Sequence, residues 1–448
     1  MKNIGKGLSI LLAAILIAAS LAGCANSGSG GSSQGSSSGD SQEAVTLRFV
    51  NWQSNFSEEY ALLAQEYNKL NPNVTVVMEY VGDMNSTEYL KKVDLMLLGG
   101  ENVDIVGASS ATHHSPRALS GQYLPLDDFF AAEGVEAEDI YTAQTRVDGK
   151  TYAIFTDTKP RIVLINKDML DEANLPVPPL DWTWDDYREY AQKLTKGEGA
   201  DKVYGSYFHA WSASNQFALH TVKVGSQWFD EDGQLFLAPA FKTWMQFRYD
   251  LENVDKTSMP LSDIKSLNLA YRDQFFGEKV AMLPMGSFML PEIGSELYPH
   301  DFITTFAPLP VAEGGTKGMT FTPAIGYSIA KNSKHPQEAY DFLRYMTTEG
   351  VNMLGIGFSA EEGADKKESI DRMLQGAEHL VDIEALERVM NNPDWQDNVD
   401  DIIPEYFSQI DTMILEETDM YLLDAQTIDD MMKNIEEKGQ KIIDEASK

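Results

Sequence analysis

Three runs of sequence decide the fold: VTLRFV at residues 45–50, VTVVMEY at 74–80 and VDIV at 103–106. Each is rich in β-branched or aromatic residues and has the length of a strand. Helical periodicity fills the two intervals between them. The first helix ends before Pro72, and Asn85 is placed to cap the second. The order strand, helix, strand, helix, strand predicts an α/β fold with a parallel sheet and right-handed crossovers.

Three later helices are also clear from the sequence. Thr183 with Asp186 has the spacing of a capping box, which predicts a helix start. Pro336 opens a helix whose apolar residues recur at i, i+3, i+4 and i+7. Thr427 and Asp430 have the same spacing before a long amphipathic segment. We therefore expect a C-terminal helix that packs its apolar stripe on the body of the protein.

The N-terminus has the pattern of a lipoprotein signal peptide. A short basic start and an apolar core precede LAGC at residues 21–24, and the chain then becomes rich in Ser and Gly. Residues 1–23 are predicted to be cleaved, Cys24 to carry the lipid, and 24–43 to form a flexible tether. The alternative is a thiol after a membrane-spanning helix, but the apolar run is shorter than the ~20 residues that a span needs.

Composition excludes several classes of partner. The chain has 448 residues, of which 43% are hydrophobic, so its length predicts two or three domains with ample cores. Its formal net charge of −34 repels nucleic acid and anionic lipid alike. Cys24 is the single cysteine, so no disulfide is expected. We expect a monomer that binds no nucleic acid.

Motifs for catalysis or metal binding are found only in the wrong context. G-x-S-x-G at residues 31–35 lies in the tether, where no strand precedes it. A looser dinucleotide fingerprint at 355–360 follows a predicted helix instead of a strand. His113 and His114 are adjacent, so their side chains diverge. We expect no metal, no cofactor and no catalytic residue, and hence a protein that is not an enzyme.

Aromatic and uncharged polar residues follow the predicted strands, where a parallel sheet presents its ligands. They are Trp52, Gln53 and Asn55 after the first strand, Asp83 after the second, and Ser109, Ser110 and His113 after the third. Sugars suit such residues, because a pyranose stacks on aromatic rings and needs paired donors and acceptors. Two structural alternatives remain open: Trp52 could pack at the helix entry against Tyr60 or Leu63, and the two serines could cap a loop.

An ordered series of motifs covers the middle of the chain. It consists of DGKTYA (148–153), LINKD (164–168), NLP (174–176), PP (178–179), WTWDDY (182–187), FGEKVAM (276–282), MGSF (285–288), PLP (308–310) and SKHPQEA (333–339). Their order and spacing resemble those of the extracellular solute-binding proteins of carbohydrate ABC importers, the maltose-binding-like group called family 1. The resemblance extends over nearly the whole chain.

This resemblance implies a two-lobe, periplasmic-binding-protein-like fold with a hinge and an interlobe ligand cleft. It places the chain crossings near Lys159 and near Phe302. The expected lobes are residues 44–158 plus 301–349 for lobe 1 and residues 159–300 plus 350–448 for lobe 2.

The resemblance also implies further ligand-binding residues. Phe288 stands where relatives often place a ligand-stacking tryptophan, and Gly286 and Ser287 belong to the same motif. The other implied residues are Asp157 and Arg161 at the first crossing, and His209 and Trp211 in the second lobe. Two alternatives are open: Arg161 could form a hinge salt bridge, and Trp211 could belong to the core.

Three departures from the family pattern bear on the ligand. Ile165 replaces a tyrosine, Ser109 and Ser110 occupy a place where the maltodextrin binder has an aromatic residue, and Phe288 replaces tryptophan. A shorter or differently decorated glycan is therefore favoured over a long maltodextrin. The expected protein is a sugar receptor, lipid-anchored on the outer face of the cell membrane, that delivers its ligand to permease subunits.

Three other functions remain as alternatives. The first is a receptor of the same fold for a peptide, a polyol or a phosphorylated compound. The second is a surface glycoside hydrolase, which would need two carboxyl groups ~5–9.5 Å apart; Asp83 and Asp157 are the only candidate pair. The third is an adhesion or sensory protein without a transporter.

Overall fold

The computed structural model describes residues 43–82, 84–142, 146–222, 228–230, 232–398 and 403–446. Glu43–Lys448 form one compact unit. The predicted signal peptide, Cys24 and the predicted tether up to residue 42 lie outside the described residues, as does Asp83.

The N-terminal part of the chain builds a six-stranded sheet. Its strands, in spatial order, are β13 (Phe358–Ser359), β6 (Ile154–Thr158), β12 (Ala324–Ile329), β3 (Ile105–Ala108), β1 (Val45–Asn51) and β2 (Val74–Tyr80). β1 is parallel to both β2 and β3, which confirms the predicted strand-helix order, although β3 begins two residues after Val103. Asn85 caps the second helix as predicted, because its side chain accepts hydrogen bonds from two backbone N–H groups.

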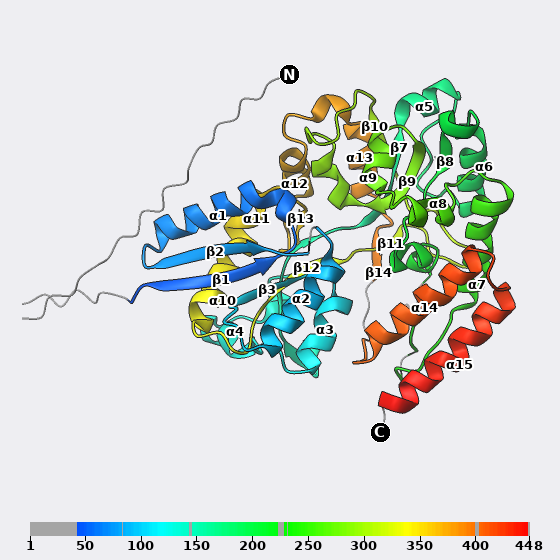
Figure 1. Cartoon of the computed structure of the whole chain (residues 1–448). Coiled ribbons are helices and arrows are strands. Elements are labelled where there is room, and N and C mark those ends of the chain that lie inside the picture. The colour runs from blue at the N-terminus through cyan, green and yellow to red at the C-terminus, as the bar shows by residue number, and fades with distance from the viewer. Residues whose placement is uncertain are drawn as a thin grey trace, which may run out of the picture. The chain divides into compact units, whose positions relative to one another are not determined.

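Helices cover both faces of this sheet, and Figure 1 shows α1 and α2 on opposite sides of β1 and β2. The helices of this part are α1 (Ser57–Leu70), α2 (Ser86–Leu98), α3 (Ala111–Leu119), α4 (Asp127–Glu133), α10 (Pro336–Tyr345) and α11 (Val351–Leu354). Phe49 of β1 meets Tyr60 of α1 and Phe342 of α10 edge to face, with centroids 6.1 and 6.2 Å apart. These contacts join α1 and α10 in one core.

The second sheet has four strands. In spatial order they are β10 (Thr304–Pro308), β7 (Arg161–Asn166), β9 (Val280–Gly286) and β8 (Tyr204–Ser206). β7 is buried on both faces: Ile162 and Leu164 join one apolar cluster, and Val163 and Ile165 join another. Ile165, which replaces a tyrosine of the family pattern, is therefore a core residue.

The remaining helices surround this second sheet. They are α5 (Lys167–Glu172), α6 (Trp184–Leu194), α7 (Pro239–Tyr249), α8 (Leu261–Ser266), α9 (Tyr271–Phe276), α12 (Lys366–Met373), α13 (Ile383–Met390), α14 (Phe407–Leu422) and α15 (Ile428–Ala446). Two small sheets pair β11 (Met319–Phe321) with β14 (Gln396–Asn398), and β4 (Arg146–Val147) with β5 (Lys150–Thr151). The capping box of Thr183 and Asp186 is present at α6.

The chain first passes between the two sheets at residues 159–160, because β6 ends at Thr158 and β7 begins at Arg161. The second passage of the chain between the sheets, which was predicted near Phe302, was wrong. β10 still pairs with β7, and the chain enters the six-stranded sheet only at β12. β13 also belongs to the six-stranded sheet, so the predicted boundaries at 301 and 350 each shift. β7 and β10 are separated by ~150 residues, and the pairing of such distant strands leaves no local signal in the sequence. This explains why the position of the second passage was predicted wrongly.

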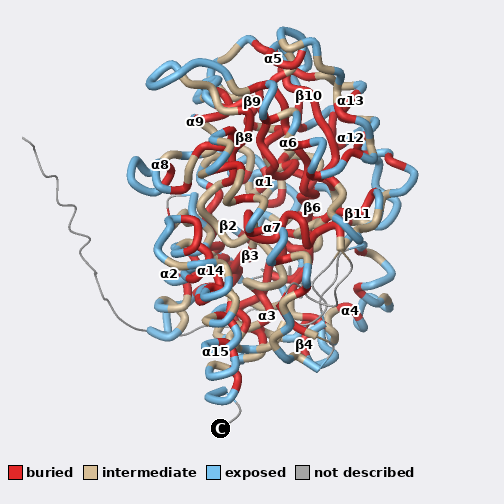
Figure 2. The backbone as a smooth tube through the Cα atoms, turned by 90° about the vertical axis from the view of Figure 1, so that its right-hand side faces the viewer, coloured by how far each residue is buried: buried red, intermediate tan, exposed pale blue. Residues whose placement is uncertain are grey.

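Burial follows the strands. Figure 2 shows buried residues along β6, β9 and β10, and exposed residues at the outer turns of helices such as α8 and α15. One apolar cluster surrounds the six-stranded sheet, and two others lie on either face of the four-stranded sheet. Each sheet thus has its own core, as expected for a two-lobe fold.

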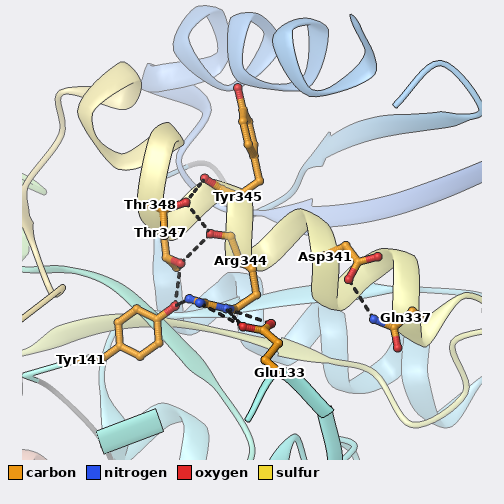
Figure 3. Close-up of polar contacts among 8 residues, drawn as sticks. All are labelled: Glu133, Tyr141, Gln337, Asp341, Arg344, Tyr345, Thr347 and Thr348. Carbon is orange, nitrogen blue, oxygen red and sulfur yellow. Dashed lines mark hydrogen bonds and ion pairs between the residues drawn. The ribbon is translucent and has the colours of Figure 1, made fainter. Parts of the chain in front are cut away.

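Helix α10 continues into a π-helical segment at Met346–Gly350, and a ring of side-chain hydrogen bonds surrounds this junction (Figure 3). Arg344 donates to the hydroxyl of Tyr141, and the hydroxyl of Thr347 donates to the carbonyl oxygen of Arg344 at 2.9 Å. The Tyr141 hydroxyl therefore donates to Thr347 Oγ1, 2.7 Å away. Arg344 also forms an ion pair with Glu133 of α4 at 3.2 Å, which ties the junction to that helix.

Candidate functional site

One edge of the four-stranded sheet gathers several of the predicted site residues. β8 is parallel to β9, so their carboxyl ends lie at the same edge, and β7 is antiparallel to β9, so Arg161 at its start lies opposite Gly286. His209 and Trp211 follow β8, and Phe288 follows β9. We call this the site edge, because side chains from three separate chain segments meet there.

An aromatic cluster lies at the site edge and consists of His209, Trp211, Tyr271 and Phe288. Trp211 and Phe288 meet edge to face with ring centroids 6.3 Å apart, and the Trp211 and Tyr271 centroids are 6.0 Å apart. His209 is 5.0 Å from Tyr271. Burial lowers the pKa of His209 to about 4, so its ring is neutral at pH 7. Each of the four side chains is half-buried, and Trp211, Tyr271 and Phe288 pack against one apolar cluster of the four-stranded sheet.

Arg161 lies against two rings of the aromatic cluster. Its Cζ is 5.1 Å from the centroid of Trp211 and 5.7 Å from that of Phe288. The residue is 7% exposed, and burial lowers its pKa to about 10, which still leaves it charged at neutral pH. Within the described part of the chain, no carboxylate lies within 4.0 Å of the guanidinium, and no group accepts a hydrogen bond from Nε or Nη1. The alternative of a hinge salt bridge at Arg161 thus finds no partner among the described residues.

The turn after β9 brings backbone close to these side chains. A Cβ atom at Gly286 would lie 2.7 Å from Cε1 of Phe288 and 3.3 Å from Nη1 of Arg161, so only glycine leaves room here. The backbone N–H of Ser287 donates to the carbonyl oxygen of Pro160 at 2.9 Å. The Ser287 hydroxyl is buried and has no hydrogen-bond partner among the described residues.

Asp157 and Lys159 form a buried ion pair at the first crossing. The distance from Asp157 Oδ2 to Lys159 Nζ is 2.5 Å, and Thr156 Oγ1 donates to the other carboxylate oxygen at 2.6 Å. Lys159 Nζ also donates to the carbonyl oxygen of Ile356. The charge of Asp157 is thus compensated within the crossing, and a contact between Asp157 and ligand remains a prediction.

The residues predicted after β1 fall into two groups. Trp52 and Gln53 are buried: the Trp52 ring lies 5.3 Å from Tyr89 of α2, and Gln53 accepts a hydrogen bond from Tyr60 at 2.8 Å. Trp52 therefore packs against α2. Asn55, in contrast, is half-buried and reaches toward the other sheet.

Asn55 connects the two sheets through a chain of polar contacts. Its Nδ2 donates to Glu292 Oε1 at 3.2 Å, and Arg272 lies 2.9 Å from the same oxygen. The guanidinium of Arg272 lies 4.7 Å from the ring of Tyr271, so these contacts continue into the aromatic cluster. A cavity of about 360 Å³ opens beside them. Its lining includes Asn55, Glu59, Glu292, Gly294, Arg372 and Gln375.

Ser109, Ser110 and His113 lie together at the end of β3 and the start of α3. Ser109 Oγ is 2.8 Å from His113 Nδ1, and Ser110 Oγ is 2.8 Å from Thr112 Oγ1. Burial, with a smaller contribution from the charge of Arg117, lowers the pKa of His113 to about 4. All three predicted residues are half-buried, and their contact with ligand remains a prediction.

Sequence reasoning missed Tyr271, Arg272 and Glu292. Tyr271 and Arg272 begin α9, and Glu292 ends the turn after β9, so none of them directly follows a predicted strand. The single available signal was the aromatic Tyr271 a few residues before the FGEKVAM motif. The N-terminus of α9 lies at the site edge because of tertiary packing, which the local sequence does not predict.

The described residues lack two kinds of feature. They contain no group of three or more His, Cys, Asp or Glu side chains that could hold a metal ion. No helix among them has the length and apolar character required to cross a membrane.

Known proteins resemble this chain in sequence and in fold. A lipoprotein from the oleD 5′ region of Streptomyces antibioticus is 26% identical over 316 residues, which cover 67% of this chain and 66% of that protein. The multiple sugar-binding protein of Streptococcus mutans is 23% identical over 332 residues, which cover 68% of this chain and 72% of that protein. The chain thus spans about two thirds of the length of these relatives.

A solved structure matches almost the whole fold. The ABC substrate-binding protein of Listeria monocytogenes in complex with cycloalternan superposes with a TM-score of 0.75, covering 90% of this chain and 99% of that chain at 18% identity. This likeness shows the two-lobe, maltose-binding-like fold. The family described as bacterial extracellular solute-binding protein matches residues 51–353, more than half of the sequence. The protein therefore belongs to the bacterial extracellular solute-binding proteins.

Proposed function

We propose that this protein is the substrate-binding lipoprotein of an ABC importer, which captures a sugar or oligosaccharide between its lobes and delivers it to a membrane permease. The aromatic cluster at the site edge carries this proposal. Trp211, Tyr271 and Phe288 offer ring faces, and the buried N–H and O–H groups of Arg161 and Ser287 have no partner among the described residues. Sugars combine apolar ring faces with hydroxyl groups that need such donors.

The comparisons support a sugar as the class of ligand. One relative is named a multiple sugar-binding protein, and the matched Listeria structure contains cycloalternan. Ile165 lies in the core, so no aromatic ring projects toward a ligand from that position. We therefore propose a short or decorated glycan rather than a long maltodextrin.

The arrangement of the lobes supports binding without chemical change. Asn55 from one lobe and Glu292 from the other meet beside the aromatic cluster, so a ligand held there would be enclosed when the lobes approach each other. The carboxyl groups of Asp157 and Glu292 are each held in an ion pair, with Lys159 and with Arg272. We propose that the solute is released intact.

Calorimetric titration of the purified protein with a panel of mono- and oligosaccharides, peptides and polyols tests this function. We expect micromolar or tighter binding of at least one sugar, and chromatography should recover that sugar unchanged after incubation. Binding of a peptide or polyol with no response to any sugar would refute the proposed ligand class. Recovery of a cleaved saccharide would instead favour a glycoside hydrolase.

The membrane anchor is a separate part of the proposal. It is supported by LAGC at residues 21–24 and by a relative that is named a lipoprotein. Metabolic labelling with a radioactive fatty acid should label the wild-type protein, and Cys24→Ser should remove the label and release the protein into the soluble fraction. Equal labelling of both proteins would contradict lipidation at Cys24.

A further inference from the structure

Three cationic side chains lie at or near the site edge, and two of them are neutralised. Lys159 is 2.5 Å from a carboxylate oxygen of Asp157, and Arg272 is 2.9 Å from one of Glu292. Arg161 differs from both, because no carboxylate of the described residues lies within 4.0 Å of its guanidinium. Since Arg161 is 93% buried, its charge is removed from water without compensation.

Several of the free polar atoms near Arg161 are donors. Nε and Nη1 of Arg161 and Nε1 of Trp211 are buried without hydrogen-bond partners in the described part of the chain, and these three atoms can only donate. The hydroxyl of Ser287, next to Gly286 on the neighbouring strand, is also without a partner. A neutral sugar hydroxyl both donates and accepts, whereas an ionised carboxylate only accepts. The donor set therefore matches a carboxylate better than a hydroxyl.

The rings beside Arg161 favour the same group. Trp211 and Phe288 lie within 5.1 and 5.7 Å of its Cζ, so they fix the guanidinium by cation–π contact. A fixed guanidinium presents parallel N–H groups that bind a carboxylate through two hydrogen bonds. Because Gly286 has no Cβ, the guanidinium and the Phe288 ring can both pack against its backbone.

The single positive charge of Arg161 favours a carboxylate over a phosphate as the bound anion. Arg161 supplies one positive charge, and a carboxylate supplies one negative charge. A phosphate monoester carries about −1.5 to −2 at pH 7, so it would leave negative charge buried in a protein whose net charge is already −34. A monoanionic carboxylate leaves the site neutral.

We propose that the solute is an acidic sugar with one carboxylate, such as a uronic acid or an oligosaccharide containing one, and that Arg161 binds this carboxylate with Trp211 and Ser287 as further donors. This inference rests on the proposed function and narrows its class of ligand. Ring stacking on the aromatic cluster and the charge of Arg161 would then act on different parts of the same molecule.

Matched pairs of sugars test the proposal. Galactose and galacturonic acid, glucose and glucuronic acid, and the corresponding disaccharides are titrated into the purified protein, with galactose 6-phosphate as the phosphate probe. In at least one pair we expect the acid to bind about 30-fold more tightly than its neutral partner, because charge-assisted hydrogen bonds are stronger than neutral ones. Equal binding within every pair, or tighter binding of the phosphate, would overturn the assignment of a carboxylate.

Variants assign the preference to Arg161. Arg161→Gln should weaken binding of the acid far more than binding of its neutral partner, and so abolish the preference for the acid. Trp211→Phe keeps a ring and removes one N–H group, so it should reduce the preference for the acid in part. This variant tests the proposal if Arg161→Gln does not fold. The control is Arg188→Gln on α6, whose guanidinium is 2.6 Å from Asp255; it should retain the full preference.

The outcomes separate this inference from the proposed function. A neutral sugar that binds while its acid does not would leave the function intact and refute the inference. A preference for the acid that persists in Arg161→Gln would also refute it. No binding of any sugar, acidic or neutral, would refute the proposed function itself.

Discussion

At the scale of single residues, Phe288 is the clearest test of the aromatic cluster. Phe288→Ala removes a ring that contacts Trp211, Tyr271 and Arg161. We expect it to weaken sugar binding by at least ~1 kcal/mol, the scale of an aromatic contact. Because the side chain is half-buried, the free energy of unfolding should fall by less than ~2 kcal/mol. Calorimetry and thermal unfolding measure the two effects.

The matched control is Phe236→Ala, which removes the same side chain from a position that is 45% exposed. It should alter neither affinity nor stability. An affinity of Phe288→Ala equal to that of the parent would remove Phe288 from the ligand site.

Arg161 leads to an unusual expectation for stability. Since its buried charge is uncompensated among the described residues, Arg161→Met should raise the free energy of unfolding of the ligand-free protein by about 1–2 kcal/mol. Arg248 provides the contrast, because it is also buried but lies 2.7 Å from Glu252. Arg248→Met should lower stability by about 3–5 kcal/mol, since it leaves Glu252 buried without its partner. Urea unfolding compares the two variants, and a loss of stability in Arg161→Met would show that Arg161 is structurally required.

At the scale of elements, the junction between α10 and the π-helical segment depends on the hydrogen-bond ring of Figure 3. Tyr141→Phe removes one hydroxyl and leaves Thr347 Oγ1 without its donor. We expect the free energy of unfolding to fall by about 1–2 kcal/mol, the cost of an unsatisfied buried group. Sugar affinity should stay within twofold. Thermal unfolding and calorimetry check both expectations.

Tyr190→Phe is the control for this variant. Its hydroxyl donates one hydrogen bond, to the carbonyl oxygen of Pro176, at an exposed position. The loss should be below ~0.5 kcal/mol, because water replaces the partner. Equal stability of Tyr141→Phe and the parent would mean that the ring does not support the junction.

The same scale shows what sequence could and could not predict. β1, α1, β2, α2 and β3 were predictable because periodicity, the Asn85 cap and the stop before Pro72 are local. β10 was placed in the wrong lobe because its partner β7 lies over a hundred residues away. In the candidate site, Arg161 and Phe288 came from family motifs at strand ends. Tyr271 was missed because α9 reaches the site edge only through tertiary packing.

At the scale of the whole molecule, buried histidines link stability to pH. Burial lowers the pKa of His113, His114 and His209 to about 4. It lowers the pKa of His220 further. The unfolded chain binds these protons near pH 6.5, so stability is fully present above that pH and is lost as the pH falls toward 4. Burial raises the pKa of Asp341 and other carboxyls, which opposes this trend.

A single variant isolates one histidine from the opposing groups. At pH 7.5, the free energy of unfolding of His114→Leu should lie within ~1.5 kcal/mol of that of the parent. As the pH falls from 6.5 to 4, the stability of this variant relative to the parent should rise by up to about 1.4 kcal/mol for each pH unit. Urea unfolding at pH 7.5 and pH 4.5 measures the difference. His379→Leu, at an exposed position, should show no such gain. A parallel pH dependence of His114→Leu and the parent would contradict the account.

Among the described residues, Lys159 contacts two other segments that lie between the two sheets. Its backbone N–H donates to the carbonyl oxygen of Pro323, and its ammonium group bonds to Asp157 and to the carbonyl oxygen of Ile356. Ile356 belongs to the core of the six-stranded sheet, and Phe358 to a core of the four-stranded sheet. Lys159 thus holds three segments of backbone together at one place. We expect any relative movement of the lobes to bend all of these segments together at Lys159, so that the two sheets would turn as rigid bodies about one point.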